Sequence, residues 1–222
     1  MNLGILFSGG KDSTFASWLA NKNGYHISCL ISIFSENKDS FMFHTPSIER
    51  VREQSKIMKI PLVIVKTKGD KEKELKDLER AIKIAIRKYK INGVITGAVE
   101  SVYQTSRIQK ICNKLKIECF NPLWQKDHIE LLNDLIKNKF EVIITGVFAE
   151  GLDKNLLGRI IDRDFIKDIK ILNKKYGISI SGEGGEYESF VINCPLFETK
   201  LKIVNFRDYG KENSWRREVE VR

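Results

Sequence analysis

Hydrophobic and polar positions follow two different periods along the first half of the chain. Short apolar runs, each long enough for one buried strand, lie at residues 3–7, 26–34, 61–66, 93–97 and 117–120. The stretches between them carry apolar side chains at helical spacing, as at Leu78, Ile82 and Ala85. Strands that alternate with helices predict an α/β fold with a parallel sheet and right-handed crossovers.

The pattern changes after the segment Asn-Pro-Leu-Trp at 121–124. Beyond it we expect a helix at 127–138, a strand at 141–148, a helix that ends at Gly177, and β segments at 189–193, 201–205 and 215–221. The chain is therefore predicted to have two parts that pack together. These are an N-terminal domain of residues 1–124 and a smaller C-terminal α+β domain of residues 125–222.

Composition is that of a soluble globular protein, with 42% hydrophobic and 30% charged residues. No apolar run approaches a membrane span and nothing resembles a signal peptide, so we expect a cytoplasmic protein without a membrane partner. The net charge of +9 comes largely from lysines that mix with acidic residues on helices, which favours a solvated surface over a nucleic-acid interface. The four cysteines include no Cys-x-x-Cys pair, which favours free thiols over a zinc or iron–sulfur site.

The most specific segment follows the first predicted strand. It consists of Ser8, Gly9, Gly10, Lys11, Asp12 and Ser13. Strand, glycine turn and helix in this order form an anion site, because the glycines admit a ligand to the backbone and the first N–H groups of the helix point at it. Lys11 and the serine hydroxyls suit phosphate. Asp12 would repel phosphate unless a cation lies between them, which indicates Mg²⁺.

The glycine spacing of this loop differs from that of the Walker-type loop. Ser-Gly-Gly-Lys-Asp-Ser instead resembles the pyrophosphate loop of the N-type ATP pyrophosphatases. This resemblance implies a Rossmann-like, HUP-type domain that splits ATP between its α and β phosphates and adenylylates a substrate. Ligands of parallel sheets bind beyond the carboxyl ends of the strands. We therefore expect Ile33 and Gly97, which lie near such ends, beside the adenosine and the α-phosphate.

A second unusual segment, the acidic segment at residues 181–189, reads Ser-Gly-Glu-Gly-Gly-Glu-Tyr-Glu-Ser. Its carboxylates Glu183, Glu186 and Glu188 could hold Mg²⁺, contact a cationic substrate group, or act as acid or base. The alternative is an acidic turn before the next strand. The three glycines of the segment weigh against this alternative, because an exposed turn rarely needs them.

The two segments together resemble the archaeal and eukaryotic diphthine–ammonia ligases, or diphthamide synthases. The resemblance extends to residues 42–46, 96–99, 103–107, 122–124, 151–153 and 157–159, and so to nearly the whole chain. Ser189 replaces the commoner threonine but keeps the hydroxyl group. The extra C-terminal domains of eukaryotic members are not seen, so the chain is similar to the archaeal single-module type.

The resemblance implies the last step of diphthamide synthesis on elongation factor 2. ATP activates the carboxylate of diphthine, and free ammonium supplies the amide nitrogen. The implied catalytic groups are Lys11, Asp12, Glu183, Glu186 and Glu188. The implied ATP site consists of residues 8–13 with Ile33, His44 and Gly97, and Asp12 holds Mg²⁺. The implied substrate contacts are Tyr103, Arg107, Trp124, Gly151, Leu152, Gly184 and Gly185.

Several alternatives stay open at this point. Tyr103 and Trp124 equally suit packing, and Arg107 a surface ion pair. A tRNA-modifying enzyme of the same superfamily would also adenylylate its substrate, although the lack of Cys-x-x-Cys argues against thiolation. An ATP-binding sensor without turnover would not need the acidic segment. The sequence also leaves open whether the chain forms a homodimer.

Overall fold

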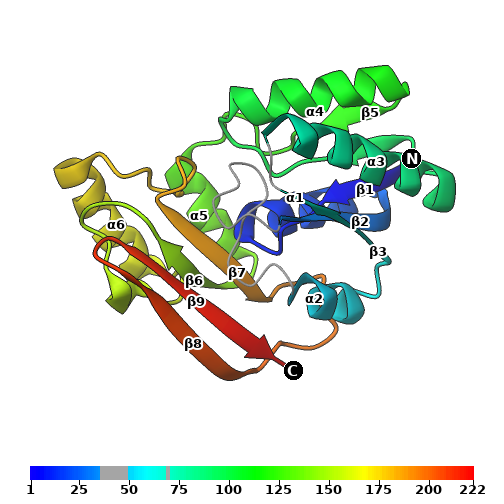
Figure 1. Cartoon of the computed structure of the whole chain (residues 1–222). Helices are drawn as coiled ribbons and strands as arrows, with labels where there is room; N and C mark the ends of the chain where they lie inside the picture. Colours follow the sequence, from blue (N-terminus) through cyan, green and yellow to red (C-terminus); the bar gives the residue numbers. More distant parts are fainter. Residues whose placement is uncertain (36–49, 69–70) are drawn as a thin grey trace.

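The computed structural model describes residues 1–35, 50–68 and 71–222. The first half forms a parallel sheet of five strands in the order β3-β2-β1-β4-β5. These strands are β1 (Asn2–Leu6), β2 (His26–Ser35), β3 (Leu62–Thr67), β4 (Gly93–Ile95) and β5 (Glu118–Phe120). The predicted α/β fold is therefore confirmed (Figure 1). The strand order reverses between β1 and β4, which is where ligands bind in sheets of this type.

Helices cover both faces of this sheet. They are α1 (Lys11–Lys22), α2 (Val51–Met58), α3 (Lys71–Tyr89) and α4 (Val102–Leu115). Leu30 of β2 packs in the same cluster as residues of α1 and α2, whereas its neighbour Ile31 packs in the cluster of α3 and α4. Because successive strand residues point to opposite faces, the two helix pairs lie on opposite sides of the sheet.

The strand predicted at 93–97 ends two residues early, at Ile95. Thr96 N still donates to Phe120 O of β5 over 3.0 Å, and beyond it the Thr96 hydroxyl donates to Asn121 Oδ1 over 2.6 Å and accepts a hydrogen bond from Ala98 N. The chain after β4 thereby turns across the end of the sheet, toward the loop that follows β1.

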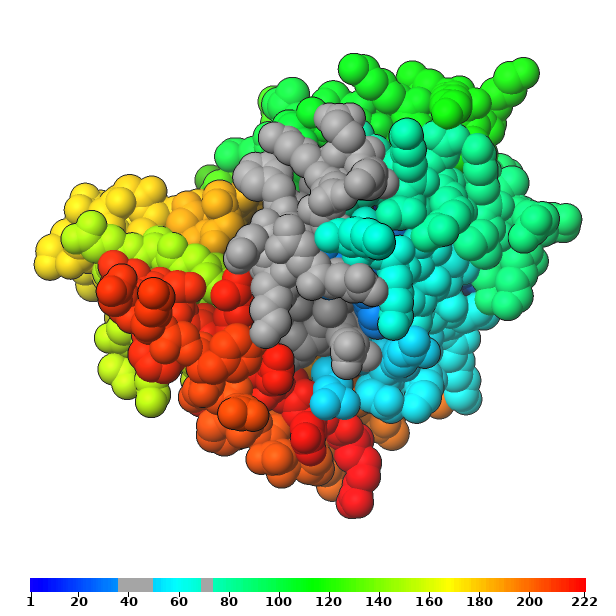
Figure 2. Space-filling model, in the orientation of Figure 1, coloured from blue at the N-terminus to red at the C-terminus, as the bar shows by residue number. Residues whose placement is uncertain are grey.

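The second half contains an antiparallel sheet of four strands in the order β7-β6-β9-β8. Its elements are α5 (His128–Lys137), β6 (Glu141–Val147), the 3₁₀ helix η2 (Lys154–Leu156), α6 (Arg163–Tyr176), β7 (Tyr187–Asn193), β8 (Ile203–Lys211) and β9 (Ser214–Val221). The last two strands are longer than predicted, because their pairing continues to Lys211 and Ser214 and makes one hairpin. This hairpin forms the lower left surface in Figure 2.

One apolar core joins the two halves. Phe15 of α1, Leu131 of α5, Val142 of β6 and Phe165 of α6 belong to the same buried cluster. The rings of Phe15 and Phe140 meet edge to face, with their centroids 5.4 Å apart. The two sheets thus share a core, and the division into domains at residue 124 stays a prediction.

Two further expectations concern the chain as a whole. None of the helices in the described part of the chain is long and apolar enough to span a membrane. No disulfide joins any two of the four cysteines, which all lie among the described residues, and Cys29, Cys112 and Cys194 are buried.

Candidate active site

The predicted phosphate-binding loop joins β1 to α1. Gly10 is the N-cap residue of α1, and it has no side chain that could accept a hydrogen bond from the first N–H groups of the helix. Gly9 has a φ of +79°, and a Cβ atom there would lie 2.3 Å from Gln54 Oε1. Within the loop, Ser13 Oγ accepts a hydrogen bond from Ser8 N over 3.2 Å. The loop is therefore folded tightly and keeps the N-terminus of α1 suited to an anion.

Lys11 and Asp12 form an ion pair in this loop. Lys11 is 4% exposed, and its Nζ lies 2.7 Å from Asp12 Oδ2. The other oxygen, Asp12 Oδ1, is buried and has no hydrogen-bond partner in the described part of the chain. An unpaired buried carboxylate oxygen is costly and suits a hard cation, so Asp12 fits Mg²⁺. Since no cluster of three metal-ligating side chains occurs among the described residues, phosphate and water would supply the other ligands.

Gly97 lies directly against the phosphate-binding loop, at the point where the strand order reverses. A Cβ atom on Gly97 would lie 2.6 Å from Ser13 N and 2.7 Å from the carbonyl carbon of Asp12. Both neighbours are backbone atoms at the start of α1, so a side chain at residue 97 would displace the loop. Gly97 thus lies next to the phosphate-binding loop, and its lack of a side chain permits this close contact.

The acidic segment is bonded to the phosphate-binding loop. Ser189 Oγ accepts a hydrogen bond from Lys11 N over 3.2 Å. Beyond it, Val191 N donates to Gly9 O over 3.0 Å. Gln54 Nε2 donates to both Gly9 O and Val191 O, over 3.0 and 2.8 Å. The start of β7 therefore lies along the loop, and the two predicted segments form one site.

Tyr187 lies between the two halves of this site. Its hydroxyl group donates a hydrogen bond to Ile180 O over 2.7 Å, and its ring centroid lies 5.6 Å from Lys11 Nζ. Burial, together with the negative charges of Asp12 and Glu186, raises the pKa of Tyr187 well above its usual value. A neutral phenol thus lies close to the loop aspartate and to one glutamate of the acidic segment.

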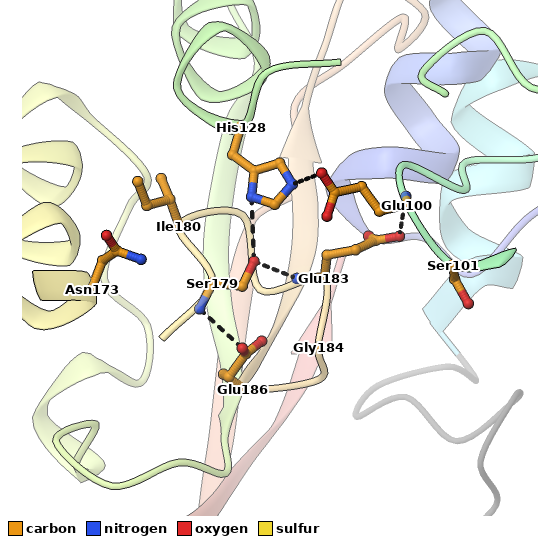
Figure 3. A pocket seen from close by; sticks show the side chains of 9 residues that line it. All are labelled: Glu100, Ser101, His128, Asn173, Ser179, Ile180, Glu183, Gly184 and Glu186. Atoms are coloured by element: carbon orange, nitrogen blue, oxygen red, sulfur yellow. Dashed lines mark hydrogen bonds and ion pairs between the residues drawn. The ribbon is translucent and has the colours of Figure 1, made fainter. Parts of the chain in front are cut away.

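The acidic segment also borders a pocket of about 450 Å³ (Figure 3). The lining residues are Glu100, Ser101, His128, Asn173, Ser179, Ile180, Glu183, Gly184 and Glu186. Glu186 Oε1 accepts a hydrogen bond from Ser179 N over 2.9 Å. Its other oxygen is buried, and no described residue hydrogen-bonds it. With three carboxylates and one imidazole in this lining, the pocket suits a cationic group.

Glu188 has a different environment from Glu183 and Glu186. It follows Tyr187 on β7, so its side chain lies on the opposite face of that strand. Glu188 pairs with Gly146 of β6, and Gly146 pairs on its other side with Arg216 of β9. Burial raises the pKa of Glu188 to about 8, and the positive charge of Arg216 opposes this shift only in part. The third predicted glutamate therefore does not belong to the lining of the acidic pocket.

Three predicted substrate contacts lie near the loop after β4. The guanidinium carbon of Arg107 lies 3.4 Å from the ring centroid of Tyr103, and Arg107 Nη1 donates to the carbonyl of Tyr103. Both residues belong to α4 and are partly exposed. Trp124 is also partly buried, in the turn after β5. These three side chains are partly exposed, and their roles stay predictions.

Other predicted residues lie outside the pocket. Ile33 is buried against the cluster of α3 and α4, and Leu152 is buried in the core shared by the two halves. Gly151 lies against the ring of Tyr176, and Gly185 lies in the exposed turn of the acidic segment with a φ of +86°. His44 lies outside the described residues.

Sequence patterns did not identify several residues of the site. Gln54 is a fully buried polar residue on the apolar side of α2, and this mismatch with the helical pattern is a usable signal. Glu100, His128 and Ser179 resemble ordinary surface positions in the sequence. They come together only through the fold, as Figure 3 shows.

Comparison with known proteins shows the family of the chain. Residues 1–119 match the family model for the diphthamide synthase N-terminal domain, and residues 127–220 match the one for the diphthamide synthase C-terminal domain. The chain belongs to the diphthamide synthase family. The first matched range includes the phosphate-binding loop of this diphthamide synthase family member, and the second includes its acidic segment.

Curated relatives carry the name diphthine–ammonia ligase. Those from Bos taurus and Homo sapiens are each 32% identical, over 91% of this chain and 83% of theirs. The relative from Saccharomyces cerevisiae is 29% identical over 87% of this chain and 33% of its own. A solved structure described as a predicted subunit of tRNA methyltransferase from Methanocaldococcus jannaschii is similar over 88% of this chain and 98% of that chain, with a TM-score of 0.48 and 20% identity.

Proposed function

We propose that this chain catalyses the ATP-dependent amidation of diphthine on elongation factor 2 to diphthamide. The proposal follows from membership of the diphthamide synthase family. The observation that carries it is the hydrogen bond between Lys11 N and Ser189 Oγ, two residues 178 positions apart. It places a loop suited to ATP phosphates beside a segment suited to a substrate that carries a carboxylate and a cation.

The reaction needs two steps, because a carboxylate has no leaving group that ammonia can displace. First, an oxygen of the diphthine carboxylate attacks the α-phosphorus of ATP, and pyrophosphate leaves. Second, ammonia attacks the carbonyl carbon of the resulting acyl adenylate, AMP leaves with the bonding electrons, and an amide remains. Each ammonium ion loses two protons in all, one to become the attacking ammonia and a second when the nitrogen of the tetrahedral adduct becomes the neutral amide.

The phosphate-binding loop would act on the first step. The N-terminus of α1, Lys11 and the hydroxyl groups of Ser8 and Ser13 would hold the β and γ phosphates. These groups would stabilise the charge that develops on the departing pyrophosphate. Because Ser189 and Gln54 already hold the loop in its folded form, little reorganisation is needed when the phosphates bind.

Asp12 is the residue we expect to hold Mg²⁺. Its unpaired, buried Oδ1 supports this assignment. The bound cation would supply neutralisation of the phosphate charge. In its absence Asp12 would repel the phosphates that Lys11 attracts, so the pair requires the cation for tight ATP binding.

The acidic pocket would receive the modified end of the histidine side chain. Diphthine carries a trimethylammonium group beside the carboxylate that is activated. Glu183 and Glu186 would offset that positive charge, and Gly184 allows close approach of the chain. The buried, unpaired oxygen of Glu186 is the group that a cation would most directly complement.

Glu188 lies outside the lining of the acidic pocket, so its predicted catalytic role rests on the family resemblance. Burial raises the pKa of its carboxyl group to about 8, so the group is mostly protonated at neutral pH and would have to lose that proton before it could accept one from ammonium. We also propose that free ammonium is the nitrogen source and that the reaction takes place in the cytoplasm. A tRNA-modifying activity and a non-catalytic sensor are not favoured, because the relatives are named as ligases of diphthine.

A single assay tests the proposal. The purified chain is incubated with ATP, Mg²⁺, ammonium and elongation factor 2 that carries diphthine, and both AMP and the intact mass of the factor are followed. We expect AMP to form in step with conversion of the carboxylate to the amide. AMP without a mass change would contradict the substrate assignment, and ATP binding without any AMP would contradict the ligase activity.

A further inference from the structure

One wall of the acidic pocket is a closed ring of four residues (Figure 3). Glu100 N donates a hydrogen bond to Glu183 Oε1 over 3.0 Å, and Glu183 N donates to Ser179 Oγ over 3.2 Å. Ser179 Oγ lies 3.4 Å from His128 Nδ1. The ring of contacts closes where His128 Nε2 lies 3.3 Å from Glu100 Oε1, an ion-pair distance without hydrogen-bond geometry that attracts only when the imidazole is protonated.

The ring brings together three separate parts of the chain. Glu100 belongs to the loop after β4, whose Gly97 lies against the phosphate-binding loop. His128 is the first residue of α5, and its side chain is only 20% exposed. Ser179 and Glu183 belong to the turn that precedes β7. The ring therefore connects the acidic pocket with the surroundings of the nucleotide site.

His128 contacts two other members of the ring, both through its imidazole. One ring nitrogen faces the hydroxyl of Ser179 and the other faces the carboxylate of Glu100. Ser179 in turn contacts two of the three glutamates of the pocket, because its hydroxyl accepts from Glu183 N and its main-chain N–H donates to Glu186 Oε1. A shift of the imidazole would therefore act on the turn of residues 179–186, which carries both side chains, while the Glu183 carboxylate itself accepts from Val99 N and Glu100 N.

We propose that His128 is a positioning residue of the substrate pocket. It holds Ser179, and through Ser179 it holds Glu183 and Glu186 in the arrangement that receives the cationic end of the modified histidine. This inference rests on the proposed function. His128 does not touch the phosphate-binding loop in this ring, so its effect falls on the protein substrate rather than on ATP.

Kinetics of three variants test this role. In His128→Ala we expect the KM for diphthine-bearing elongation factor 2 to rise about tenfold, as for loss of one hydrogen bond to a charged network. The KM for ATP and the AMP-forming kcat should change less than about twofold, within the scatter of surface substitutions. His128→Asn, whose amide can take the place of Nδ1 beside Ser179, should recover most of the loss. The matched control is His26→Ala, because His26 is exposed at the start of β2.

Two kinetic results would overturn the proposal. One is an unchanged KM for the factor in His128→Ala. The other is an equal rise in both KM values together with a lowered melting temperature and no recovery in His128→Asn, which would indicate a merely structural role. No turnover by the unsubstituted chain would instead contradict the proposed function.

Amide hydrogen exchange, followed by mass spectrometry, tests the positioning role without turnover. We expect faster exchange in the peptide that spans residues 179–186 for His128→Ala than for His26→Ala, because Glu183 N loses a fixed acceptor. Equal exchange in the two variants would overturn the positioning role, whether or not the ligase assay succeeds.

Discussion

The main-chain N–H of Lys11 donates a hydrogen bond to Ser189 Oγ over 3.2 Å. The last residue of the acidic segment therefore satisfies one of the first N–H groups of α1, a role that a capping side chain plays in other helices. Gly10, the N-cap residue, has no side chain that could accept this hydrogen bond. Ser189, which accepts it, is buried. A hydroxyl group at residue 189 is thus required by the phosphate-binding loop as well as by the strand to which it belongs.

Ser189→Ala should weaken ATP binding, while Ser189→Thr should preserve it. Loss of the capping bond is expected to cost about 1 kcal/mol of stability. A loss of the same size in ATP binding, because the loop is no longer held in its folded form, would raise the KM for ATP by about fivefold. Urea unfolding and AMP formation at varied ATP measure the two effects. Equal KM values in the alanine and threonine variants would contradict the role of the hydroxyl group.

The sequence alone was sufficient to predict the parallel sheet and to identify both segments of the site. Periodicity identifies β2 and α3, and the glycine turn with Lys11 and Asp12 specifies an anion site from local chemistry alone. The bond between Lys11 and Ser189 was not predictable, because it depends on how β7 packs against the first loop. Residues at ends of strands were the least certain, as Ile33 shows, because its side chain packs under α3 rather than toward the edge of the sheet.

The same limit explains why Gln54 and His128 were not predicted. Each lies on a helix with an ordinary amphipathic pattern, and each acquires its partners from distant segments. Gln54 differs from His128 in one respect, since a fully buried amide on the apolar side of a helix breaks the pattern. Such a residue must find hydrogen-bond partners in the fold, which is a signal that sequence analysis can use.

Asp12→Asn should abolish AMP formation and leave the fold intact. The amide keeps the shape of the side chain but binds Mg²⁺ weakly, so we expect a loss of about a hundredfold or more in kcat/KM. AMP release measures activity and thermal unfolding reports the fold. Asp164→Asn is the matched control, because Asp164 is an exposed aspartate paired with Lys167 on α6. Normal turnover in Asp12→Asn would contradict the metal role of this residue.

Gly97→Ala should impair ATP binding more than its small size suggests. The new Cβ atom would lie 2.6 Å from Ser13 N, a backbone atom that cannot rotate away. Displacement of the loop is expected to raise the dissociation constant for ATP by about tenfold or more, as for other overpacked sites that cost 1–3 kcal/mol. Isothermal titration measures it. Gly24→Asn is the control, since no atom lies within 4 Å of a Cβ there and asparagine tolerates its positive φ.

Gln54→Leu should destabilise the contact between the loop and β7. The amide Nε2 of Gln54 donates to Gly9 O and to Val191 O. Leucine has no donor, so Val191 O loses the hydrogen bond that Gln54 gives it. A cost of about 2 kcal/mol is expected for the lost buried hydrogen bonds. Urea unfolding measures it, with Gln109→Leu on α4 as the control, because Gln109 is partly exposed and its amide bonds only to a neighbouring side chain of the same helix. A free energy of unfolding equal to that of the control would contradict the bridging role of Gln54.

Glu188 should make the protein less stable as the pH rises. Burial raises the pKa of its carboxyl group from 4.5 to about 8, so the folded protein keeps a proton that the unfolded chain releases. The stability that the neutral carboxyl contributes is complete below pH 4.5 and is lost as the pH rises through about 8. Glu188→Gln removes this titration. Its free energy of unfolding relative to the unsubstituted chain should therefore increase between pH 5 and pH 8.5, by on the order of 3 kcal/mol. Urea unfolding at several pH values measures the difference, and a difference independent of pH would show that Glu188 is ionised in the folded protein.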